Sequence, residues 1–554
     1  MKFVSRWQVL SLALALSVNA APVRDDAATY DAIVIGSGPA GLVVADRLSA
    51  AGKKTLLLEQ GGPSYFVTGG TERPSWLAGT SLSRVDVPGL YSSIFSVASS
   101  LLCGSFVAGA FQGCAIGGNS AINAGLFFQP PASDWDLYFP TGWKNSDMQS
   151  AIAKVYTEQP STNTPSLDGK RYLQSGYDIA RTWLVTGAGF KETYLNTNHT
   201  NHSKTKVFGH TIYSSHGGQR SGPVKTYLQD ALKRSNFALQ SGTKAIRVIR
   251  NGATASGVEI SVNGSSSTSI VNLSPNGRVI VSGGALQSPQ ILMWSGIGDP
   301  AALQQLASGG HLSLPSSQWI NNTAVGDKLF DNPNTFIELY SPSISSYYPD
   351  YNNPIPADRD QYLNSRSGPY SFAGQTSAFW DFIQQGTDKI GCQGTIGTGG
   401  FADYTQNGTV TLNVYGTSGM RSFGRVNLNN NGVAQPTGGF FYSDNRDAQA
   451  IGQFIFNIFQ KLPPTLQPLN IAGNSTLNQI ISYITTGSTY TRGNVQHWSS
   501  SCRFGTCVDV DTKVLGTTNI HVVDASISAP LTTNPMLGTM IIAERAVERI
   551  LALN

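Results

Sequence analysis

A glycine-rich loop near the start of the chain has the residue types and spacing that bind a dinucleotide. Gly36, Gly38 and Gly41 fit the pattern G-x-G-x-x-G. In that pattern one glycine permits a tight turn, one lets the backbone approach a pyrophosphate, and one allows a helix to pack closely on a strand. Glu59 follows 18 residues after Gly41, where a carboxylate can accept hydrogen bonds from ribose hydroxyls. The loop therefore predicts a dinucleotide cofactor, and alone it does not distinguish NAD from FAD.

The segments on either side of this loop have the patterns of the strand and helix that it requires. Residues 29–35 are apolar and β-branched, which is typical of a buried strand, and residues 42–48 carry the small and apolar side chains of a helix packed on a sheet. Residues 54–59 repeat the strand pattern. A β-α-β unit of this kind implies a parallel sheet, so the start of the chain predicts a Rossmann-like domain.

Buried-strand patterns return far along the chain. Residues 279–281 and 520–524 are apolar and β-branched, and residues 538–553 have the pattern of a closing helix. Residues 300–490 instead alternate and are rich in aromatic side chains, which indicates a mixed or antiparallel sheet with helices. The first domain is therefore discontinuous in sequence, and the middle of the chain forms a second domain.

The composition excludes several kinds of partner. The chain has 554 residues, which favours two domains, and only 13% of them are charged. Its formal net charge is +4 without a basic cluster, so nucleic-acid binding is not expected. No segment after the N-terminus has the run of about 18 apolar residues that a membrane span needs. No Cys/His cluster has the spacing of a zinc site, so no metal is expected.

The N-terminus and the sequons indicate the secretory route. Residues 1–20 have the form of a signal peptide, with Lys2 and Arg6 before an apolar run that ends in small residues. Seven N-x-S/T sequons follow, at Asn198, Asn201, Asn263, Asn272, Asn321, Asn407 and Asn474. We therefore predict a secreted, extracellular glycoprotein with no membrane anchor.

Five cysteines follow the predicted signal peptide, in a compartment that permits disulfides. Cys103 lies close to Cys114 in sequence, and Cys502 lies close to Cys507, which favours two local disulfides and leaves Cys392 free and buried. Spacing alone does not fix the connectivity.

The dinucleotide loop is one of four motifs that occur together in this chain. The others are GGNSAIN at residues 117–123, GALQSPQILMWSGIG at residues 284–298 and VDASISAPLTTNP at residues 523–535. Together these motifs resemble those of the glucose-methanol-choline (GMC) oxidoreductases, which use FAD. The resemblance implies FAD as the cofactor, held by Gly36, Gly38, Gly41, Glu59, Gly117, Gly118, Asn119, Ser120, Asn123, Asp524 and Ala525.

Within that family, further segments resemble the flavin domain of fungal cellobiose dehydrogenases. They include residues 168–173 and 221–224, and His497-Trp498 where most of the wider family has His-Pro. Those enzymes carry a haem domain before the flavin domain. Here the flavin fold starts shortly after the predicted cleavage site, so we expect a flavoprotein without a haem domain.

The resemblance and the strand patterns together give an α/β fold with two domains. We predict a Rossmann-like FAD-binding domain of GMC type, made of residues 29–145, 205–300 and 505–554. A discontinuous α+β substrate-binding domain, built on a mixed or antiparallel sheet, takes residues 146–204 and 301–504.

The resemblance also implies which residues carry out the reaction. Oxidation of an alcohol removes the hydroxyl proton together with a hydride, so a base must lie within hydrogen-bond distance of the hydroxyl. A histidine suits this role near neutral pH, and of seven histidines His497 stands at the position of the family's base. Asn534 matches the second member of the pair and would orient the same hydroxyl. FAD would accept the hydride at its N5 atom.

The expected substrate positions depart from the cellobiose-oxidising pattern. Ser92 stands where that group has an acidic residue, Gln496 stands where it has Asn, and Phe423 aligns with an Arg of its sugar site. These changes remove charges that would hold a disaccharide. Trp498 is either a core or pocket-wall aromatic, or a platform on which the substrate packs.

We therefore predict a secreted FAD-dependent dehydrogenase or oxidase that acts on a CH–OH group, with a mono- or oligosaccharide as the first candidate substrate. The alternatives are the same chemistry on a non-sugar alcohol or lactol of secondary metabolism, and a non-redox FAD-containing cyclase or lyase. The external electron acceptor stays open among oxygen, a quinone and a redox protein. Fold and family do not choose among them.

Overall fold

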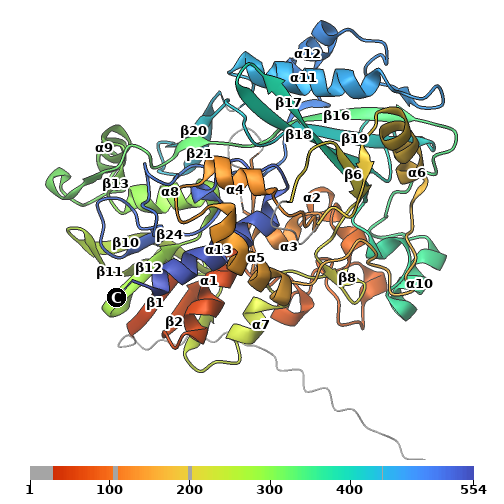
Figure 1. The fold of residues 1–554 in the computed structure, drawn as a ribbon. Helices are drawn as coiled ribbons and strands as arrows, with labels where there is room; N and C mark the ends of the chain where they lie inside the picture. The colour runs from red at the N-terminus through yellow and green to blue at the C-terminus, as the bar shows by residue number, and fades with distance from the viewer. Residues whose placement is uncertain (1–28, 104–109, 197–201, 440, 554) are drawn as a thin grey trace, which may run out of the picture.

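The chain folds around two sheets (Figure 1). The strands of the first come from residues 29–58, 237–281 and 520–522, and those of the second come from residues 191–210 and 333–494. The computed structural model describes residues 29–103, 110–196, 202–439 and 441–553. The predicted signal peptide and the sequons at Asn198 and Asn201 lie outside the described residues.

Seven strands of the described chain form the first, mostly parallel sheet. Their order is β10-β11-β12-β1-β2-β9, and β24 pairs with β12. The neighbours of β1, β2 and β24 run parallel, whereas β10 and β11 add an antiparallel edge. The bounds are β1 Thr29–Ile35, β2 Thr55–Leu58, β9 Phe237–Gln240, β10 Thr243–Asn251, β11 Thr254–Val262, β12 Thr268–Val281 and β24 Ile520–Val522.

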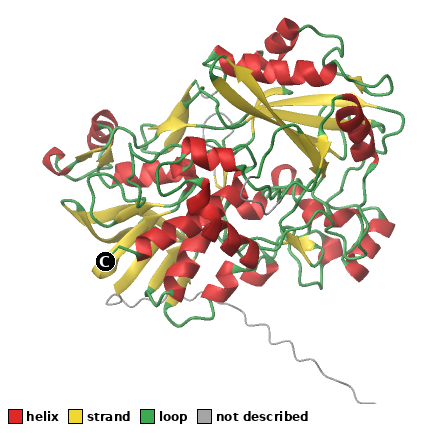
Figure 2. Ribbon diagram, in the orientation of Figure 1, coloured by secondary structure: helices red, strands yellow, loops and turns green. Residues whose placement is uncertain are grey.

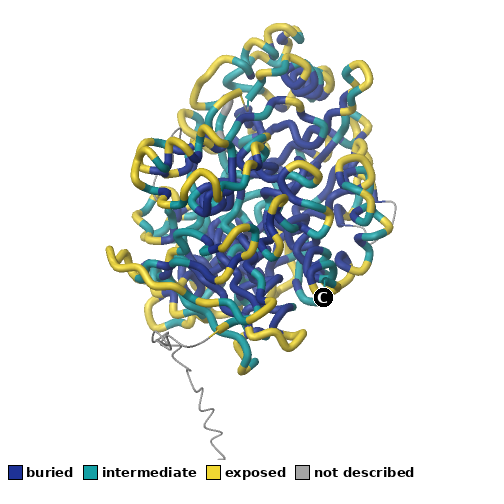
Figure 3. Tube along the Cα trace, turned by 90° about the vertical axis from the view of Figure 1, so that its left-hand side faces the viewer, coloured by how far each residue is buried: buried dark blue, intermediate teal, exposed yellow. Residues whose placement is uncertain are grey.

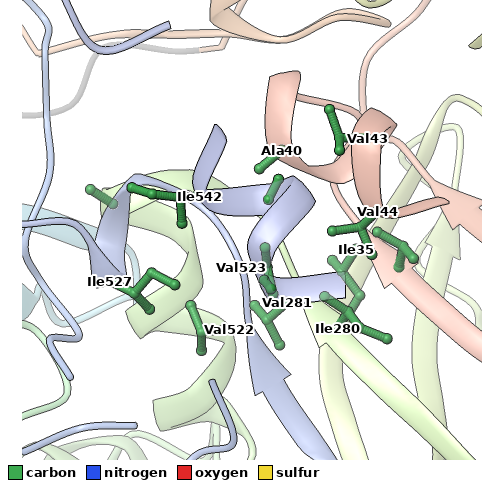
Figure 4. Close-up of a cluster of buried hydrophobic side chains, with 14 of the residues drawn as sticks. Ile35, Ala40, Val43, Val44, Ile280, Val281, Val522, Val523, Ile527 and Ile542 are labelled. Carbon is green, nitrogen blue, oxygen red and sulfur yellow. The ribbon is translucent and has the colours of Figure 1, made fainter. Parts of the chain in front are cut away.

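Two helices from opposite ends of the chain cover this sheet, α1 (Pro39–Ala50) and α13 (Pro535–Leu551). Figure 4 shows where their apolar side chains meet those of the strands, at residues such as Ile35, Val44, Ile280, Val522 and Ile542. Each of these five side chains is at most 4% exposed. Burial of one such side chain stabilises the fold by about 1.5–3 kcal/mol. This core therefore fixes the loop between β1 and α1 beside the end of β24.

Eight strands of the described chain form the second sheet, which is antiparallel except for the parallel pair β5 and β6. Its order is β22-β16-β19-β18-β17-β6-β5, and β23 pairs with β16. The bounds are β5 Lys191–Glu192, β6 Val207–His210, β16 Pro333–Tyr340, β17 Gln375–Gln385, β18 Asp388–Gly397, β19 Thr409–Gly416, β22 Gln467–Pro468 and β23 Thr491–Asn494. Both sheets agree with the fold class predicted from the sequence.

The two faces of the second sheet have different roles. Along β19, Val410, Leu412 and Val414 point into a buried core with α11 (Asn445–Phe459), which packs across the sheet (Figures 1 and 2). The alternate residues Thr411, Asn413 and Tyr415 face a cavity on the other side. This follows from the two-residue period of a strand. The outer face therefore holds the domain together, and the inner face can contact a ligand.

The other α-helices and strands of the described residues lie around the two sheets. The helices are α2 Ser93–Ser96, α3 Asn119–Ile122, α4 Ala132–Tyr138, α5 Asn145–Glu158, α6 Ser175–Arg181, α7 Tyr227–Ala231, α8 Gly284–Trp294, α9 Pro300–Ser308, α10 Pro356–Ser365 and α12 Leu477–Thr485. The small strands are β3 Leu102–Cys103, β4 Gln112–Gly113, β7 Ser215–His216, β8 Gln219–Arg220, β13 Ile297–Gly298, β14 Ile320–Asn321, β15 Asp327–Leu329, β20 Gly424–Leu428 and β21 Ala434–Gly438. Figure 3 shows exposed segments around a buried interior.

The structure moves three of the predicted domain boundaries. The sequence predicts β6 within the FAD-binding segment 205–300, but β6 pairs with β17 in the second sheet. It predicts α5 within the substrate-binding segment, but α5 packs against α13, where Lys154 lies 2.8 Å from Glu548. The sequence also predicts β20 and β21 within the substrate-binding segment 301–504, but both strands pack on α8 of the first domain. A short strand or helix pattern does not say which sheet it will join, so these segments could not be assigned from sequence.

The two local disulfides predicted from spacing are present. Cys103 is bonded to Cys114 and Cys502 to Cys507, while Cys392 is free and buried on β18. None of the helices in the described residues combines the length and apolar character that crossing a membrane requires.

Candidate active site

One cavity of about 790 Å³ extends from the dinucleotide loop to His497 and Asn534. This volume is typical of a site for a cofactor or small molecule. The sequence-predicted residues that line it are Gly36, Gly38, Glu59, Ser92, Gly118, Asn119, Ser120, Asn123, Gln496, His497, Trp498, Asp524, Ala525 and Asn534. Gly41, Gly117 and Phe423 lie outside its lining.

Gly41 and Gly117 act behind the cavity wall. A Cβ atom on Gly41 would lie 1.9 Å from the carbonyl oxygen of Gly36, and one on Gly117 would lie 2.7 Å from Cγ2 of Val224. Gly117 also has a φ of +103°, which favours glycine. Both residues therefore permit close packing of the protein behind the cavity lining.

Gly38 faces the cavity at the N-terminus of α1. A Cβ atom there would meet no protein atom within 4 Å. Gly38 is the residue that precedes Pro39, the first residue of α1, and the first N–H groups of a helix lack partners within it. Such a helix end attracts phosphate. A side chain at Gly38 would fill this cradle without disturbing the protein around it.

Glu59 holds the dinucleotide loop as well as facing the cavity. Its Oε2 accepts hydrogen bonds from the N–H of Ser37 at 2.9 Å and from Oγ of Ser37 at 2.7 Å, and its Oε1 accepts one from the N–H of Gly61 at 2.8 Å. A carboxylate has about four acceptor positions. These bonds orient the carboxylate, which also lines the cavity. Burial raises the pKa of Glu59, whereas these hydrogen bonds oppose that change.

Asp524 ties β24 to α8. Its Oδ1 accepts hydrogen bonds from the N–H and Oγ of Ser526, and its Oδ2 accepts from the N–H of Gly284 at 2.8 Å and Oγ of Ser288 at 2.5 Å. These four bonds engage the acceptor capacity of the carboxylate. The predicted cofactor contact of Asp524 would therefore come from its backbone.

The polar residues around α3 are fixed by the protein. Asn119 Oδ1 accepts from the N–H of Gly113 at 2.7 Å, and Ser120 Oγ donates to the carbonyl of Gly117 at 2.7 Å. Asn123 Oδ1 accepts from Nη1 of Arg220 at 2.9 Å. This segment therefore presents a rigid surface to the cavity.

His497 and Asn534 meet at the other end of the cavity, although 37 residues separate them along the chain. Nε2 of His497 lies 3.4 Å from Nδ2 of Asn534. Asn534 directly precedes α13, so the packing of that helix places it. Burial lowers the pKa of His497 to about 3, because a charged imidazolium is disfavoured there. The neutral ring is therefore available as a base throughout the physiological range of pH.

Asn534 is held by two residues of the second sheet. Its Oδ1 accepts a hydrogen bond from Nε2 of Gln393 at 2.7 Å and another from the hydroxyl of Tyr415 at 3.3 Å. Gln393 and Tyr415 face each other across β18 and β19. With its oxygen engaged, the amide directs its NH₂ group toward His497.

The backbone of His497 is held by a buried carboxylate. Asp331 accepts hydrogen bonds from the N–H of His497 at 2.8 Å and of Gln496 at 3.1 Å. Burial raises the pKa of Asp331 to about 7, against the effect of these hydrogen bonds. Asn332, the next residue, lies 2.8 Å from Nδ1 of His497 through its Oδ1.

Sequence reasoning missed Asp331, Asn332, Gln393 and Tyr415. Asp331 and Asn332 follow the apolar pair Leu329-Phe330, and two polar residues before a strand are a weak sign of a site. Gln393 is a polar residue with a fully buried side chain in the middle of a strand. Burial is not visible in the sequence, so this sign could not have been used.

Gln496 and Trp498 support each other beside His497. Trp498 Nε1 donates to Oε1 of Gln496 at 2.8 Å, and the N–H of Phe111 donates to the same oxygen at 3.0 Å. Trp498 is 5% exposed and still lines the cavity. It is therefore a core aromatic and a wall residue at once. Ser92 lines the cavity near Tyr91.

Phe423 lies away from the cavity. Its ring packs against Phe330 at a centroid distance of 5.9 Å, and the guanidinium of Arg503 lies 4.4 Å from its centre. The sequence predicts Phe423 in the substrate site, but in the structure it does not line the cavity. Phe423 directly precedes β20, which begins at Gly424.

The cavity wall near His497 is uncharged. Among the described lining residues, the side chains of Asp, Glu, Lys and Arg are Glu59, Lys244 and Asp524, all at the dinucleotide end. The second sheet contributes Asn334 and Asn413, whose buried Oδ1 atoms lack a hydrogen-bond partner. Aromatic side chains complete this wall, at Tyr91, Phe95, Phe111, Phe336, Tyr347, Tyr348, Phe401, Tyr415 and Trp498. Within the described residues, no group of three or more His, Cys, Asp or Glu could hold a metal ion.

Comparison with protein families gives two matches. The models described as "GMC oxidoreductase" match residues 30–334 and residues 421–543. Together these segments cover more than half of the chain. They include the dinucleotide loop, His497 and Asn534.

Named relatives are similar to part of the chain in sequence, and solved structures are similar to it in fold. The chain is 27% identical over 379 residues to the chloroplastic fatty acid photodecarboxylase of Chlamydomonas reinhardtii, and 30% identical over 323 residues to the oxygen-dependent choline dehydrogenase of Photobacterium profundum. These matches cover 65% and 56% of this chain but only 59% and 52% of the relatives. Formate oxidase has a similar fold, with a TM-score of 0.74 and 16% identity over 95% of this chain and 98% of that chain.

Proposed function

The chain belongs to the GMC oxidoreductase family, which binds FAD, and we propose that it oxidises an alcohol carbon of a small uncharged molecule. The observation that carries this proposal is a continuous cavity that reaches from a dinucleotide loop to a paired imidazole and amide. Bound FAD would supply the acceptor for the hydride.

The residues at the dinucleotide end fit FAD. The cradle at Gly38 and the start of α1 would take the pyrophosphate, and Glu59, which lines the cavity, would face the ribose. The fixed segment of α3 and the backbone of Asp524 and Ala525 would hold the rest of the cofactor.

His497 and Asn534 would act on the substrate hydroxyl. A hydroxyl between them can donate its proton to Nε2 of His497 while it accepts a hydrogen bond from Nδ2 of Asn534. The second bond strengthens as the oxygen gains negative charge, so Asn534 favours the alkoxide-like state. Burial keeps the imidazole neutral, so its Nε2 is free to take the proton.

A mono- or oligosaccharide is the first candidate substrate. The unpaired oxygens of Asn334 and Asn413 can accept hydrogen bonds from substrate hydroxyls, and a buried acceptor left without a partner is costly. Aromatic faces such as Phe336 and Phe401 can pack against the apolar face of a sugar ring. The absence of charge in the described wall favours a neutral sugar over a charged one.

A non-sugar alcohol or lactol is the second candidate, because the same wall carries nine aromatic side chains in the described residues. The resemblance to cellobiose dehydrogenases stays a prediction, so cellobiose belongs among the sugars tested. Oxygen, a quinone or a redox protein remains the proposed electron acceptor.

Anaerobic mixing of the FAD-loaded protein with sugars, aryl alcohols and lactols tests the proposal. We expect one class to remove the visible absorbance of the flavin, and re-oxidation by oxygen or a quinone then identifies the acceptor. A protein that binds FAD and is not reduced by any alcohol would contradict the redox proposal. It would favour the non-redox alternative of a cyclase or lyase.

Secretion is part of the proposal. The sequon asparagines within the described residues are exposed, at Asn263, Asn272, Asn321, Asn407 and Asn474. Two disulfides also suit an oxidising compartment. We expect the protein in the culture medium of its source, with a mass that falls after endoglycosidase treatment. Recovery only from inside cells, with reduced cysteines, would overturn this part.

A further inference from the structure

The direction of the hydrogen bonds around His497 is fixed at one end by a backbone carbonyl. Asn332 Nδ2 donates to the carbonyl oxygen of Gly416 at 2.6 Å. A carbonyl oxygen can only accept, so the amide of Asn332 cannot be turned around without losing this bond. Its Oδ1 therefore faces Nδ1 of His497 at 2.8 Å. Asn332 is only 5% exposed, which leaves little room for another arrangement.

We infer that Asn332 is a positioning residue that keeps a proton on Nδ1 of His497 and leaves Nε2 as the basic nitrogen. The inference rests on the proposed function, because it assigns the tautomer that the proposed base must have. The physical reason is that an amide oxygen accepts and does not donate, so the nitrogen opposite it must carry the hydrogen.

The tautomer of His497 in turn determines the orientation of the Asn534 amide. A lone pair on Nε2 of His497 attracts an N–H group and repels an oxygen, so the NH₂ of Asn534 is the end that faces it at 3.4 Å. The Oδ1 of Asn534 then faces Gln393 and Tyr415, both of which can donate to it. One carbonyl, that of Gly416, thus fixes the orientation of the base and of the hydroxyl anchor through a single row of side chains.

Gln393 alone could not set this direction. Its own amide can be turned to offer either oxygen or NH₂, and its Oε1 has no partner in the structure. If the Gln393 amide were reversed, the Asn534 amide could be reversed with it, unless the lone pair on Nε2 of His497 requires an N–H group opposite it. Asn332 is different, because a main-chain carbonyl holds it.

Two substitutions at Asn332 separate the positioning role from a structural one. Asn332→Leu removes the acceptor for Nδ1–H and the donor to Gly416. Asn332→Asp keeps an acceptor for Nδ1–H but loses the donor to Gly416. If only the contact with Gly416 matters, the two variants should fail alike. If the proton on Nδ1 matters, Asn332→Asp should retain most of the rate.

Asn196 offers a matched control. It is 6% exposed, its Nδ2 donates to the carbonyl of Phe127 at 2.7 Å, and its Oδ1 accepts from the N–H of Gln129 at 2.9 Å. It is therefore a buried asparagine with the same number of bonds, outside the cavity lining. Asn196→Leu should lower stability as Asn332→Leu does and leave both the tautomer and the kinetics of the protein unchanged.

The direct measurement is the ¹⁵N NMR spectrum of the FAD-loaded protein labelled at histidine, with the signals of His497 assigned by their loss in His497→Ala. We expect Nδ1 to carry hydrogen and Nε2 to be bare in the wild type and in Asn196→Leu. Asn332→Leu should show the other tautomer or a mixture. A wild-type tautomer in Asn332→Leu would overturn the inference.

Kinetics give a second readout. General-base catalysis contributes about 10²–10⁴-fold, so we expect Asn332→Leu to lower the rate of flavin reduction by about 10²-fold, with little change in KM. Asn332→Asp should stay within about tenfold of the wild type. The acidic limb of its pH–rate profile should move to higher pH, because a carboxylate at position 332 favours the protonated imidazole of His497. Asn332→Asp as slow as Asn332→Leu, with no shift of that limb, would also overturn the inference.

The pH comparison must be made against the wild type. In the described residues, Asp331 and Tyr415 are the titratable groups placed against His497, and they are present in every variant. The difference between the variant and wild-type profiles therefore isolates the new carboxylate. If none of the alcohols reduces the FAD bound to the wild type, the proposed function fails. The NMR measurement still decides the tautomer in that case.

Discussion

The two ends of the cavity present different kinds of groups to a ligand, backbone at one end and side chains at the other. At the dinucleotide end the ligand surface is mostly backbone, formed by Gly36, Gly38 and the start of α1, which lie next to one another in the sequence. At the catalytic end it is side chains, and His497 and Asn534 are held by residues that come from β15–β16, β18 and β19. A backbone site needs the absence of side chains, whereas the catalytic end needs particular amides in particular orientations.

This difference suggests how each end should respond to substitution. A backbone cradle should fail through steric conflict, which either blocks the ligand or disturbs the fold. A row of side-chain amides should lose rate in steps, because each bond orients the next group. The two ends can therefore be broken separately, and the size of each effect tests the comparison.

The largest effect on rate should come from His497→Ala. The variant lacks the base, so we expect flavin reduction by the identified substrate to slow by about 10²–10⁴-fold, measured by anaerobic stopped-flow absorbance. FAD content should not change, because the cradle lies at the other end of the cavity. His216, an exposed residue on β7, offers the control, and His216→Ala should keep the wild-type rate. A slowing of less than about tenfold in His497→Ala would remove the assigned base.

Glycine substitutions should break the other end in two distinguishable ways. Gly38→Ala places a methyl group where no protein atom lies within 4 Å, so the melting temperature of the FAD-depleted protein should not change. FAD should nevertheless bind more than about tenfold more weakly, a loss of about 1.4 kcal/mol. Gly41→Ala should lower both the melting temperature and the affinity for FAD, because its Cβ would lie 1.9 Å from the Gly36 oxygen.

Gly487→Ala is the control for this pair, since its Cβ would also lie in open space but outside the cavity lining. Equal FAD affinity in Gly38→Ala and Gly487→Ala would show that the loop does not carry the cofactor. A lowered melting temperature in FAD-depleted Gly38→Ala would show that its effect is on the fold.

The same difference explains what could be predicted from the sequence. The order of Gly36, Gly38, Gly41 and Glu59 is local, so spacing alone indicated the dinucleotide loop. His497 and Asn534 required a family resemblance, because nothing in their local sequence brings them together. Asn332 and Gln393 were not predicted, since their roles follow from a strand register and from burial. The wrong boundary at β6 has the same origin, as its partner β17 lies more than 160 residues away.

Smaller effects should follow when the support of Asn534 is removed. Gln393→Leu removes the 2.7 Å donor to its Oδ1, and Tyr415→Phe removes the 3.3 Å donor. A net hydrogen bond contributes about 1 kcal/mol, so we expect about a fivefold to tenfold loss of rate in Gln393→Leu. Tyr415→Phe should lose less, because its bond is longer. Single-turnover reduction at saturating substrate measures both. A larger loss in Tyr415→Phe would mean that its hydroxyl contacts the substrate directly.

The smallest effect on the reaction should come from Phe423→Ala. Phe423 packs on Phe330 and under Arg503 outside the cavity lining, so KM and the rate of flavin reduction should stay within about twofold of the wild type. Stability should fall, because a partly buried ring is lost and the guanidinium of Arg503 loses its aromatic face. Thermal melting and steady-state kinetics on the same preparation check both expectations. A tenfold rise in KM at unchanged melting temperature would return Phe423 to the substrate site, and would mean that the catalytic end extends past Phe330 to a part of the wall that bound substrate alone reveals.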